Sequence, residues 1–158
     1  MSSPPNMVWH DSGGSVTTAQ SVTGVGTSGA IPLGTTSNVL TCRLYNNPGN
    51  VASTYVDATN VSFTVYDDAS HQGLAVSPVT LGLYVQMKIT SMNGSTTLAD
   101  TQFVGIGGLT KHTMPMNSAT LVGGSSNYLD ISICVVVPTT ATVALVTIAL
   151  WVEYNATA

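Results

Sequence analysis

Charged residues are scarce in this chain of 158 residues. Only 6% of its residues are Asp, Glu, Lys or Arg, whereas about a quarter is usual in soluble domains. The strong bases number three, Arg43, Lys88 and Lys111, and the net charge is −4. A nucleic-acid site needs Lys and Arg clustered on the phosphates, and a membrane surface attracts polybasic segments or basic amphipathic helices. The sequence therefore predicts neither nucleic acid nor a membrane as a partner.

Scarce charge also bears on how copies of the chain meet. Hydrophobic residues make up 44% of the sequence, so the chain is not of the disordered class and is long enough to bury a core. Copies with so few charges repel one another weakly. We expect a surface largely covered by neighbouring subunits, the alternative being a β-domain that is simply poor in charge.

Long hydrophobic runs are missing as well. The longest, VALVTIALWV (143–152), is about half as long as an α-helix that crosses a bilayer. The N-terminal stretch MSSPPNMVWHDSGG contains neither a basic segment nor an apolar one, so we expect no secretory signal peptide and synthesis in the cytoplasm.

Sequence signatures of catalysis are also lacking. GVGTSG (24–29) fits the dinucleotide-binding pattern G-x-G-x-x-G, but AIPLG follows where a helix should begin. The stretch YDDASHQG (66–73) could supply three metal ligands, Asp67, Asp68 and His71. No second acidic or histidine cluster supports a metal site there. The side chains of neighbouring residues at a strand end also point apart, so the two carboxylates would not face each other. We therefore expect a loop there, and no catalytic site, metal, cofactor or enzyme activity.

The remaining reactive side chains are isolated in the sequence. Cys42 and Cys134 are not spaced as metal ligands, and cytosolic synthesis favours free thiols over a disulfide. Cys42 lies in a strand-like run and is expected to be a buried thiol. His10 and His112 stand alone; a serine–histidine–acid triad can assemble from distant residues, but nothing in the sequence selects one.

Alternation of apolar and polar residues is the strongest pattern present. VTLGLYVQMKIT (79–90) places six aliphatic side chains on one face, as in a strand with one buried side. The same period of two occurs at 38–45, 60–67 and 128–137. The residues expected to point into the core from these strands are Leu40, Cys42, Leu44, Val61, Phe63, Val65, Val79, Leu81, Leu83, Val85, Met87, Ile89, Leu129, Ile131, Ile133, Val135 and Val137. Shorter strands are expected at 7–10, 15–23, 101–106 and 119–122.

These strands define the predicted fold. About eight of them, separated by Asn-, Pro- and Gly-rich turns and without a helical period, predict an all-β, antiparallel two-sheet sandwich. A jelly roll is favoured, with an immunoglobulin-like sandwich as the alternative. We expect residues 79–90 at the centre. We expect residues 38–158 to form the sandwich and the Gly-, Ser- and Thr-rich residues 1–37 to form an extended N-terminal arm with an edge strand. The arm must lie on its own sheet or on a neighbouring molecule to repay its ordering, and we expect the neighbouring molecule.

The last strand, 142–154, is apolar on both faces. Such a strand lies in the centre of a sheet or against another subunit. Its expected core side consists of Val146, Ile148, Leu150 and Val152. The other side offers Ala149 and Trp151 as candidates for a subunit contact, to which we add Trp9, because tryptophan is over-represented among interface hot spots.

Two segments carry a resemblance to a known family: TCRLYNNPGNVASTYVDATNVSFTVYDDAS (41–70) and VALVTIALWVEYNAT (143–157). Together with the arm and the scarce charge, they resemble small decoration (cement) proteins of tailed-bacteriophage heads. The resemblance is one of architecture over most of the chain. It implies a structural virion protein that sits as a homo-trimer on the outer capsid surface and stabilises the head by bridging major capsid subunits. The chain departs from capsid proteins that wrap RNA, because it has no basic arm.

The alternative function is a carbohydrate- or host-surface-binding module, as at a fibre or spike tip. Tyr45, Tyr66, Tyr84 and Trp9 would then form a platform for sugar rings. Against this, Tyr45 and Tyr84 can equally cover a sheet face or a subunit contact. An isolated binding module should bind glycans, whereas a cement protein should bind empty expanded shells.

Overall fold

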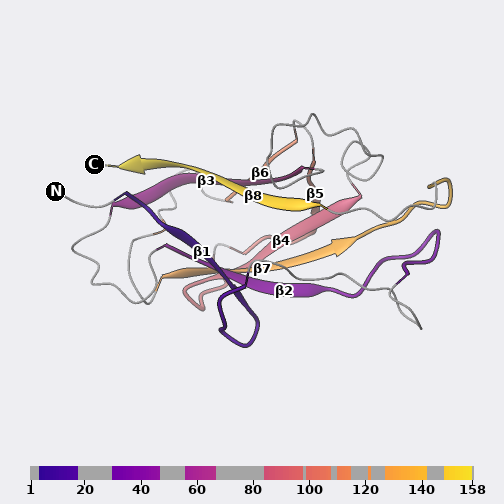
Figure 1. The fold of residues 1–158 in the computed structure, drawn as a ribbon, viewed down its shortest axis with the longest axis horizontal. Helices are drawn as coiled ribbons and strands as arrows, with labels where there is room; N and C mark the ends of the chain where they lie inside the picture. The colour runs from indigo at the N-terminus through magenta and orange to yellow at the C-terminus, as the bar shows by residue number, and fades with distance from the viewer. Residues whose placement is uncertain are drawn as a thin grey trace.

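The fold is an antiparallel β-sandwich, as the sequence predicts. A computed structural model describes residues 4–17, 30–46, 56–66, 84–97, 99–107, 110–114, 121, 127–141 and 148–157. Its strands form two sheets that lie in two layers (Figure 1). Within those ranges there is no helix, and so none long and apolar enough to cross a membrane. The choice between a jelly roll and an immunoglobulin-like sandwich stays a prediction.

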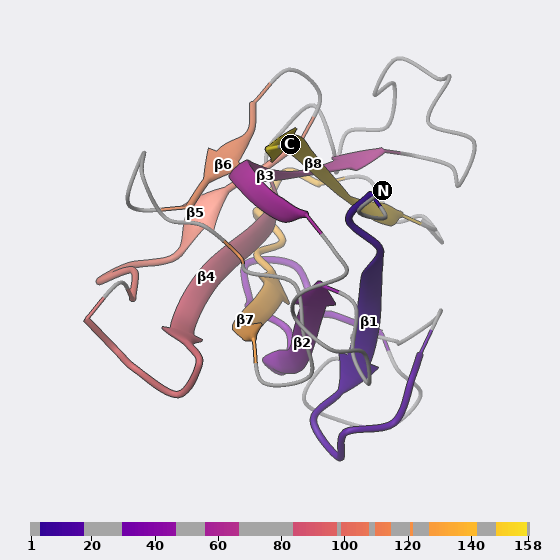
Figure 2. The ribbon, with the colours of Figure 1, turned by 90° about the vertical axis from the view of Figure 1, so that its left-hand side faces the viewer.

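One sheet has five strands in the order β1-β2-β7-β4-β5, and the other has three in the order β6-β3-β8. Figure 2 shows β1, β2, β7 and β4 following one another in one layer, with β6, β3 and β8 in the other. The strands are β1 (Met7–Asp11), β2 (Leu40–Asn46), β3 (Asp57–Tyr66), β4 (Val85–Met92), β5 (Val104–Gly105), β6 (His112–Thr113), β7 (Tyr128–Val135) and β8 (Ala149–Thr157).

The core lies between the two sheets and follows the predicted alternation. On β3, Val61, Phe63 and Val65 are at most 1% exposed. Because side chains alternate across a strand, these three point one way and their neighbours point the other. The five-stranded sheet contributes the facing residues, which include Leu44, Met87, Ile89, Leu129 and Ile131.

The strand at the centre of the larger sheet is β7, so the prediction that residues 79–90 lie at the centre is wrong for the described sheet. β4 lies between β7 and the two-residue β5, and residues 79–83 lie outside the described residues. The outward Ser132 and Cys134 of β7 are only 7% and 3% exposed. β7 is therefore buried on both faces, as central strands are, and its short outward side chains made it look half-exposed in the sequence.

β8 occupies an edge of the smaller sheet as described, where it pairs with β3. Ile148, Leu150 and Val152 pack against the core as predicted, and residues 142–147 lie outside the described residues. A central position for this strand is therefore wrong for the described sheet. The apolar side chains on the second face of β8 lie on the outside of the sandwich, and their presence does not mean that β8 has a strand on either side.

The described parts of the N-terminal arm lie on the chain's own sheet. Met7–Asp11 forms β1 and pairs along its whole length with β2. Further along, the amide of Gly34 donates to the carbonyl of Val137 at 2.8 Å, and Thr36 bridges to Val136. For these stretches the chain itself supplies the hydrogen bonds that repay the ordering of the arm.

Candidate functional site

The outer face of the five-stranded sheet carries a row of polar side chains. The strand register places His10, Arg43, Asp130 and Ser91 side by side on β1, β2, β7 and β4. Residues at the same position in an antiparallel register share a face of the sheet. Since the next residues on β2 and β7 point into the core, this row points away from it. We call it the polar row.

Hydrogen bonds hold the polar row together. The Nε of Arg43 donates to Oδ1 of Asp130 at 2.6 Å, and the hydroxyl of Ser91 donates to Oδ2 of the same carboxylate at 2.6 Å. The hydrogen bond that Arg43 donates to Asp130, and secondarily the one it makes with Tyr45, raises the pKa of the Arg43 guanidinium. The two charges compensate each other in a pair that is partly open to solvent, with side chains 36% and 27% exposed.

An aromatic row runs beside the polar row. Tyr45 and Tyr128 are register partners on β2 and β7, and their ring centroids lie 5.4 Å apart. The ring of His10 lies 4.6 Å from that of Tyr45, and the guanidinium carbon of Arg43 lies 4.2 Å from the centroid of the Tyr128 ring. A cation over an aromatic face is attracted by the ring, so the two rows fix each other's side chains.

A tight turn positions Tyr128. Asn93 and Gly94 both have positive φ, 53° and 76°, which Asn and Gly tolerate and which a two-residue hairpin turn requires. The side-chain oxygen of Asn93 accepts a hydrogen bond of 2.7 Å from the Tyr128 amide, and its Nδ2 donates to Asn127 Oδ1 at 3.0 Å. The Asn93-Gly94 turn thus holds the backbone of Tyr128, the last residue of the aromatic row, in place.

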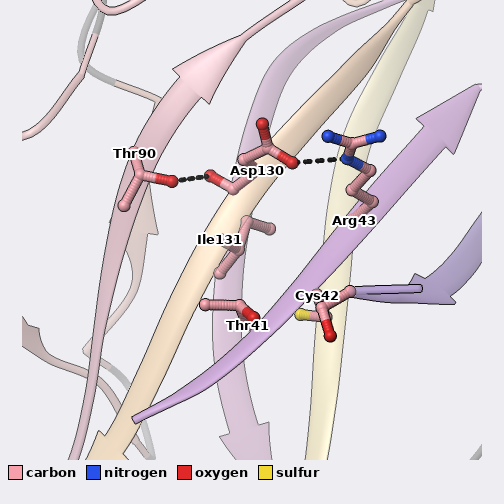
Figure 3. Close-up of a pocket in the computed structure, with 7 residues that line it drawn as sticks. Thr41, Cys42, Arg43, Thr90, Asp130 and Ile131 are labelled. Atoms are coloured by element: carbon pink, nitrogen blue, oxygen red, sulfur yellow. Dashed lines mark hydrogen bonds and ion pairs between the residues drawn. The ribbon is translucent and has the colours of Figure 1, made fainter. Parts of the chain in front are cut away.

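A shallow depression of about 250 Å³ opens at the polar row (Figure 3). Arg43 and Asp130 meet at its rim, and the hydroxyl of Thr90 donates to the Asp130 carbonyl at 3.2 Å. The lining residues are Ser12, Thr41, Cys42, Arg43, Thr90, Asp130 and Ile131. The depression offers hydroxyls and a compensated ion pair as hydrogen-bonding groups.

The thiol of Cys42 beside this depression is held protonated. Burial, and secondarily the negative charge of Asp130, raises its pKa to about 12. A thiol attacks as the thiolate, so Cys42 is a poor nucleophile near neutral pH. Burial also raises the pKa of Cys134. Both cysteines are free, as the sequence predicts.

The outer face of the three-stranded sheet has a different character. Trp151 on β8 meets Tyr66 on β3 edge to face, with centroids 6.1 Å apart and planes at 84°. Ala149 is the register partner of Tyr66. The charged groups of this face, Lys111 and Glu153, form an exposed ion pair, and the hydrogen bond to Glu153 raises the pKa of Lys111.

The structure brings together two of the three residues proposed from sequence as a subunit contact. Ala149 and Trp151 share the outer face of the three-stranded sheet, two residues apart on β8. Trp9 instead packs against the core, with its ring centroid 6.3 Å from that of Phe63. As contacts between subunits all three stay predictions. Of the proposed sugar platform, Tyr45 belongs to the aromatic row, while Tyr84 packs against the core.

The acidic and histidine-containing stretch that the sequence analysis singled out falls outside the described residues. Asp67, Asp68 and His71 lie outside the described residues, as does the glycine stretch 24–29. In the described part of the chain, no three His, Cys, Asp or Glu side chains gather in a way that could hold a metal ion.

The sequence does not predict a largely buried pair of a histidine and an aspartate. Nε2 of His112 lies 2.7 Å from Oδ2 of Asp100, and the same oxygen accepts a hydrogen bond of 2.7 Å from the Ile89 amide. The two side chains are 11% and 10% exposed. Because His112 belongs to β6 and Ile89 to β4, the pair links the two sheets at their edge. We call it the edge link; no spacing in the sequence signals it.

The edge link contains a histidine and an aspartate, which are two members of a catalytic triad. In a triad, the second ring nitrogen of the histidine faces a nucleophile. Here Asp100 joins the His112 ring of β6 to the Ile89 amide of β4, so the pair holds the two sheets together at their edge.

No family model, curated protein or solved structure matches this chain.

Proposed function

We propose that this chain is a structural, non-catalytic virion protein that decorates the outer capsid surface and bridges major capsid subunits. In this proposal it assembles with itself, as a trimer, through the outer face of the three-stranded sheet. It is made in the host cytoplasm and ends on the surface of the particle. Neither a cofactor nor a nucleic acid takes part.

The observation that carries the proposal is the composition of that outer face. Its centre holds Trp151, Tyr66 and Ala149, each half-buried in the single chain. Two of its charged groups, Lys111 and Glu153, already compensate each other, and Asp57 lies at the far end of β3. Stable interfaces combine an apolar, aromatic centre with polar groups at the rim, and a face with no unpaired charge at its centre loses little hydration when a neighbour covers it.

The energetics favour a contact centred on Trp151. Covering the part of the Trp151 side chain that is still exposed contributes about 1–2 kcal/mol. Three copies around a symmetry axis repeat that contact. Since the chain has three strong bases and seven acids, little repulsion opposes assembly, and salt should change it little.

The chemistry of the described side chains is consistent with a protein that does not catalyse. Cys42 is held as a thiol, Asp130 accepts hydrogen bonds on both carboxylate oxygens, and the edge link joins the sheets. Each of these groups therefore has a partner or an environment that lowers its reactivity.

The test of the capsid role starts from purified particles of the virus that encodes the chain. Mass spectrometry should find the protein in mature particles, and a density map should place it on the outer surface between major capsid subunits. Purified protein added to expanded empty shells should sediment with them. Absence from the particles, together with no binding to shells, would show the capsid role to be wrong.

A second candidate function, a binding module for carbohydrate or a host surface, is favoured by the other outer face. Tyr45 and Tyr128 stand there beside the Arg43–Asp130 pair. The two functions use opposite sheets, so a decoration protein can display a binding face outward while it assembles through the other.

A further inference from the structure

The outer face of the five-stranded sheet is built like a small-ligand site. Its side chains are already fixed by one another before any ligand arrives: His10 against Tyr45, Tyr45 against Tyr128, Arg43 over Tyr128. Ligand sites combine aromatic surface with a few placed polar groups. Groups that are fixed in advance lose little conformational entropy on binding.

The charges on this face decide the charge of its ligand. Arg43 is paired with Asp130 at 2.6 Å, so an anion would have to compete with a bound carboxylate, and a cation with a bound guanidinium. The other base on this face is Lys88, the register partner of Ser132. A phosphate chain or nucleic acid needs several uncompensated bases. The face therefore fits a ligand without net charge.

The remaining surface indicates a ligand rich in hydroxyls. The depression beside the ion pair is lined by the hydroxyl-bearing Ser12, Thr41 and Thr90, and a paired Arg and Asp offer both donors and acceptors to hydroxyl groups. The tyrosine rings add apolar faces with a polar tip. The depression has a volume of about 250 Å³, just under the range of about 300–1,000 Å³ that is usual for sites of drug-sized ligands. A depression of this size suits one sugar ring.

We propose that this face binds a neutral saccharide, with one pyranose ring in the depression against Arg43 and Asp130 and the adjoining ring or substituent on Tyr45 and Tyr128. The polar row supplies hydrogen bonds to the hydroxyls, and the aromatic row supplies apolar contact to the C–H faces of the sugar. Specificity comes from the fixed orientation of the two rows.

The test is an amide NMR titration of the full chain with methyl α-glucopyranoside, methyl β-galactopyranoside, methyl α-mannopyranoside and N-acetylglucosamine. At least one of these should shift the signals of β2 and β7 around Arg43 and Asp130. Tyr45→Ala should weaken that binding about tenfold or more, and Thr41→Gln, at an exposed position, should block the depression with a bulkier neutral side chain.

Tyr66→Ala is the matched control, because it removes a tyrosine from the opposite outer face. It should leave sugar binding unchanged. The proposal is overturned if no sugar shifts these signals, or if Tyr45→Ala and Thr41→Gln bind as tightly as the native chain. It is equally overturned if sodium sulfate shifts the same signals at lower concentration than every sugar, since the face would then be an anion site.

Discussion

The two outer faces of the sandwich differ in how their side chains are held. On the five-stranded sheet, a chain of contacts runs from His10 through both tyrosines to Arg43 and Asp130. On the three-stranded sheet, one edge-to-face pair, Tyr66 and Trp151, lies near an exposed ion pair. A rigid, polar face suits a small ligand, whereas a looser apolar face suits a large covered contact.

The difference arises from strand number and register. Four adjacent strands of the larger sheet contribute one side chain each to the polar row, so that hydrogen bonds can run across it. The smaller sheet has β3 with one neighbour on either side, and its outer side chains meet in pairs. The same kind of strand therefore yields the proposed binding face in one layer and the proposed assembly face in the other.

The largest expected effect concerns Cys42, which lies beside the polar row. In the folded chain its pKa is raised from 9.0 to about 12, so at about pH 8 the thiolate fraction should fall about a thousandfold, at tenfold per unit. In a Cys134→Ala background, alkylation by iodoacetamide should be slower by a similar factor when folded than in denaturant. Equal rates in the two states would mean that the core around Cys42 is open to the reagent, and would contradict its burial.

The sign of the matching stability effect follows from the raised pKa. The folded state keeps the proton that the unfolded chain loses near its ordinary value. The contribution of Cys42 to stability is therefore complete below about pH 9 and is lost as the pH rises toward 12. Cys42→Ala should therefore remove this contribution to the decrease in the free energy of unfolding at alkaline pH.

Phe63→Ala and Thr64→Val compare the two faces of β3. Phe63 is fully buried in the core, so its truncation should lower the free energy of unfolding by about 3–5 kcal/mol. Thr64 lies on the opposite face of β3, where it is also buried, and its hydroxyl donates to the Thr110 carbonyl at 3.2 Å, so its replacement should cost about 1 kcal/mol. Urea denaturation measures both, and comparable losses would contradict the assignment of the faces.

Asp100→Ala removes the edge link between the sheets. It leaves the Ile89 amide and the His112 ring without their shared acceptor, which should cost about 1–3 kcal/mol because both groups are buried. Asp11→Ala is the control: its carboxylate accepts the Ser15 amide at 2.9 Å in an exposed turn, and its loss should cost less. Thermal unfolding of the two variants compares them; an equal or larger loss for Asp11→Ala would contradict the edge link.

The smallest effect should come from the ion pairs on the two faces. Arg43→Ala removes both the contact with Asp130 and the contact with the Tyr128 ring, and should cost about 0.5–1 kcal/mol. Lys111→Ala removes an exposed pair and should leave the melting temperature unchanged. If Lys111 mattered more than Arg43, the two faces would not differ as described.

Much of the sandwich was readable from alternation alone. Leu44, Phe63, Met87 and Ile131 are buried as the period of two predicts. The order of the strands was not, because the outward Ser132 of β7 looks like a solvent-facing residue and only the assembled sheet buries it. The alternation in the sequence indicates which face of a strand a side chain lies on, whereas the side chains beside it depend on which strands pair and in which register.

The candidate surfaces depend on pairing still more. Sequence reasoning singled out Tyr45, Ala149 and Trp151, each of which lies on an outer face. It missed Arg43 and Asp130, which are 87 residues apart in the chain and meet only through the register of β2 with β7. A long-range register has no local signal in a single sequence.

The central claim, that the chain assembles through the outer face of its three-stranded sheet, is tested most directly by its mass in solution. Light scattering after size exclusion should give about three times the 16.2 kDa chain mass for the native protein. Trp151→Ser and Ala149→Glu should each give the mass of one chain with an unchanged β circular dichroism spectrum, whereas Arg43→Ala should keep the native mass. A native protein of single-chain mass, or variants that keep the oligomer, would contradict the account.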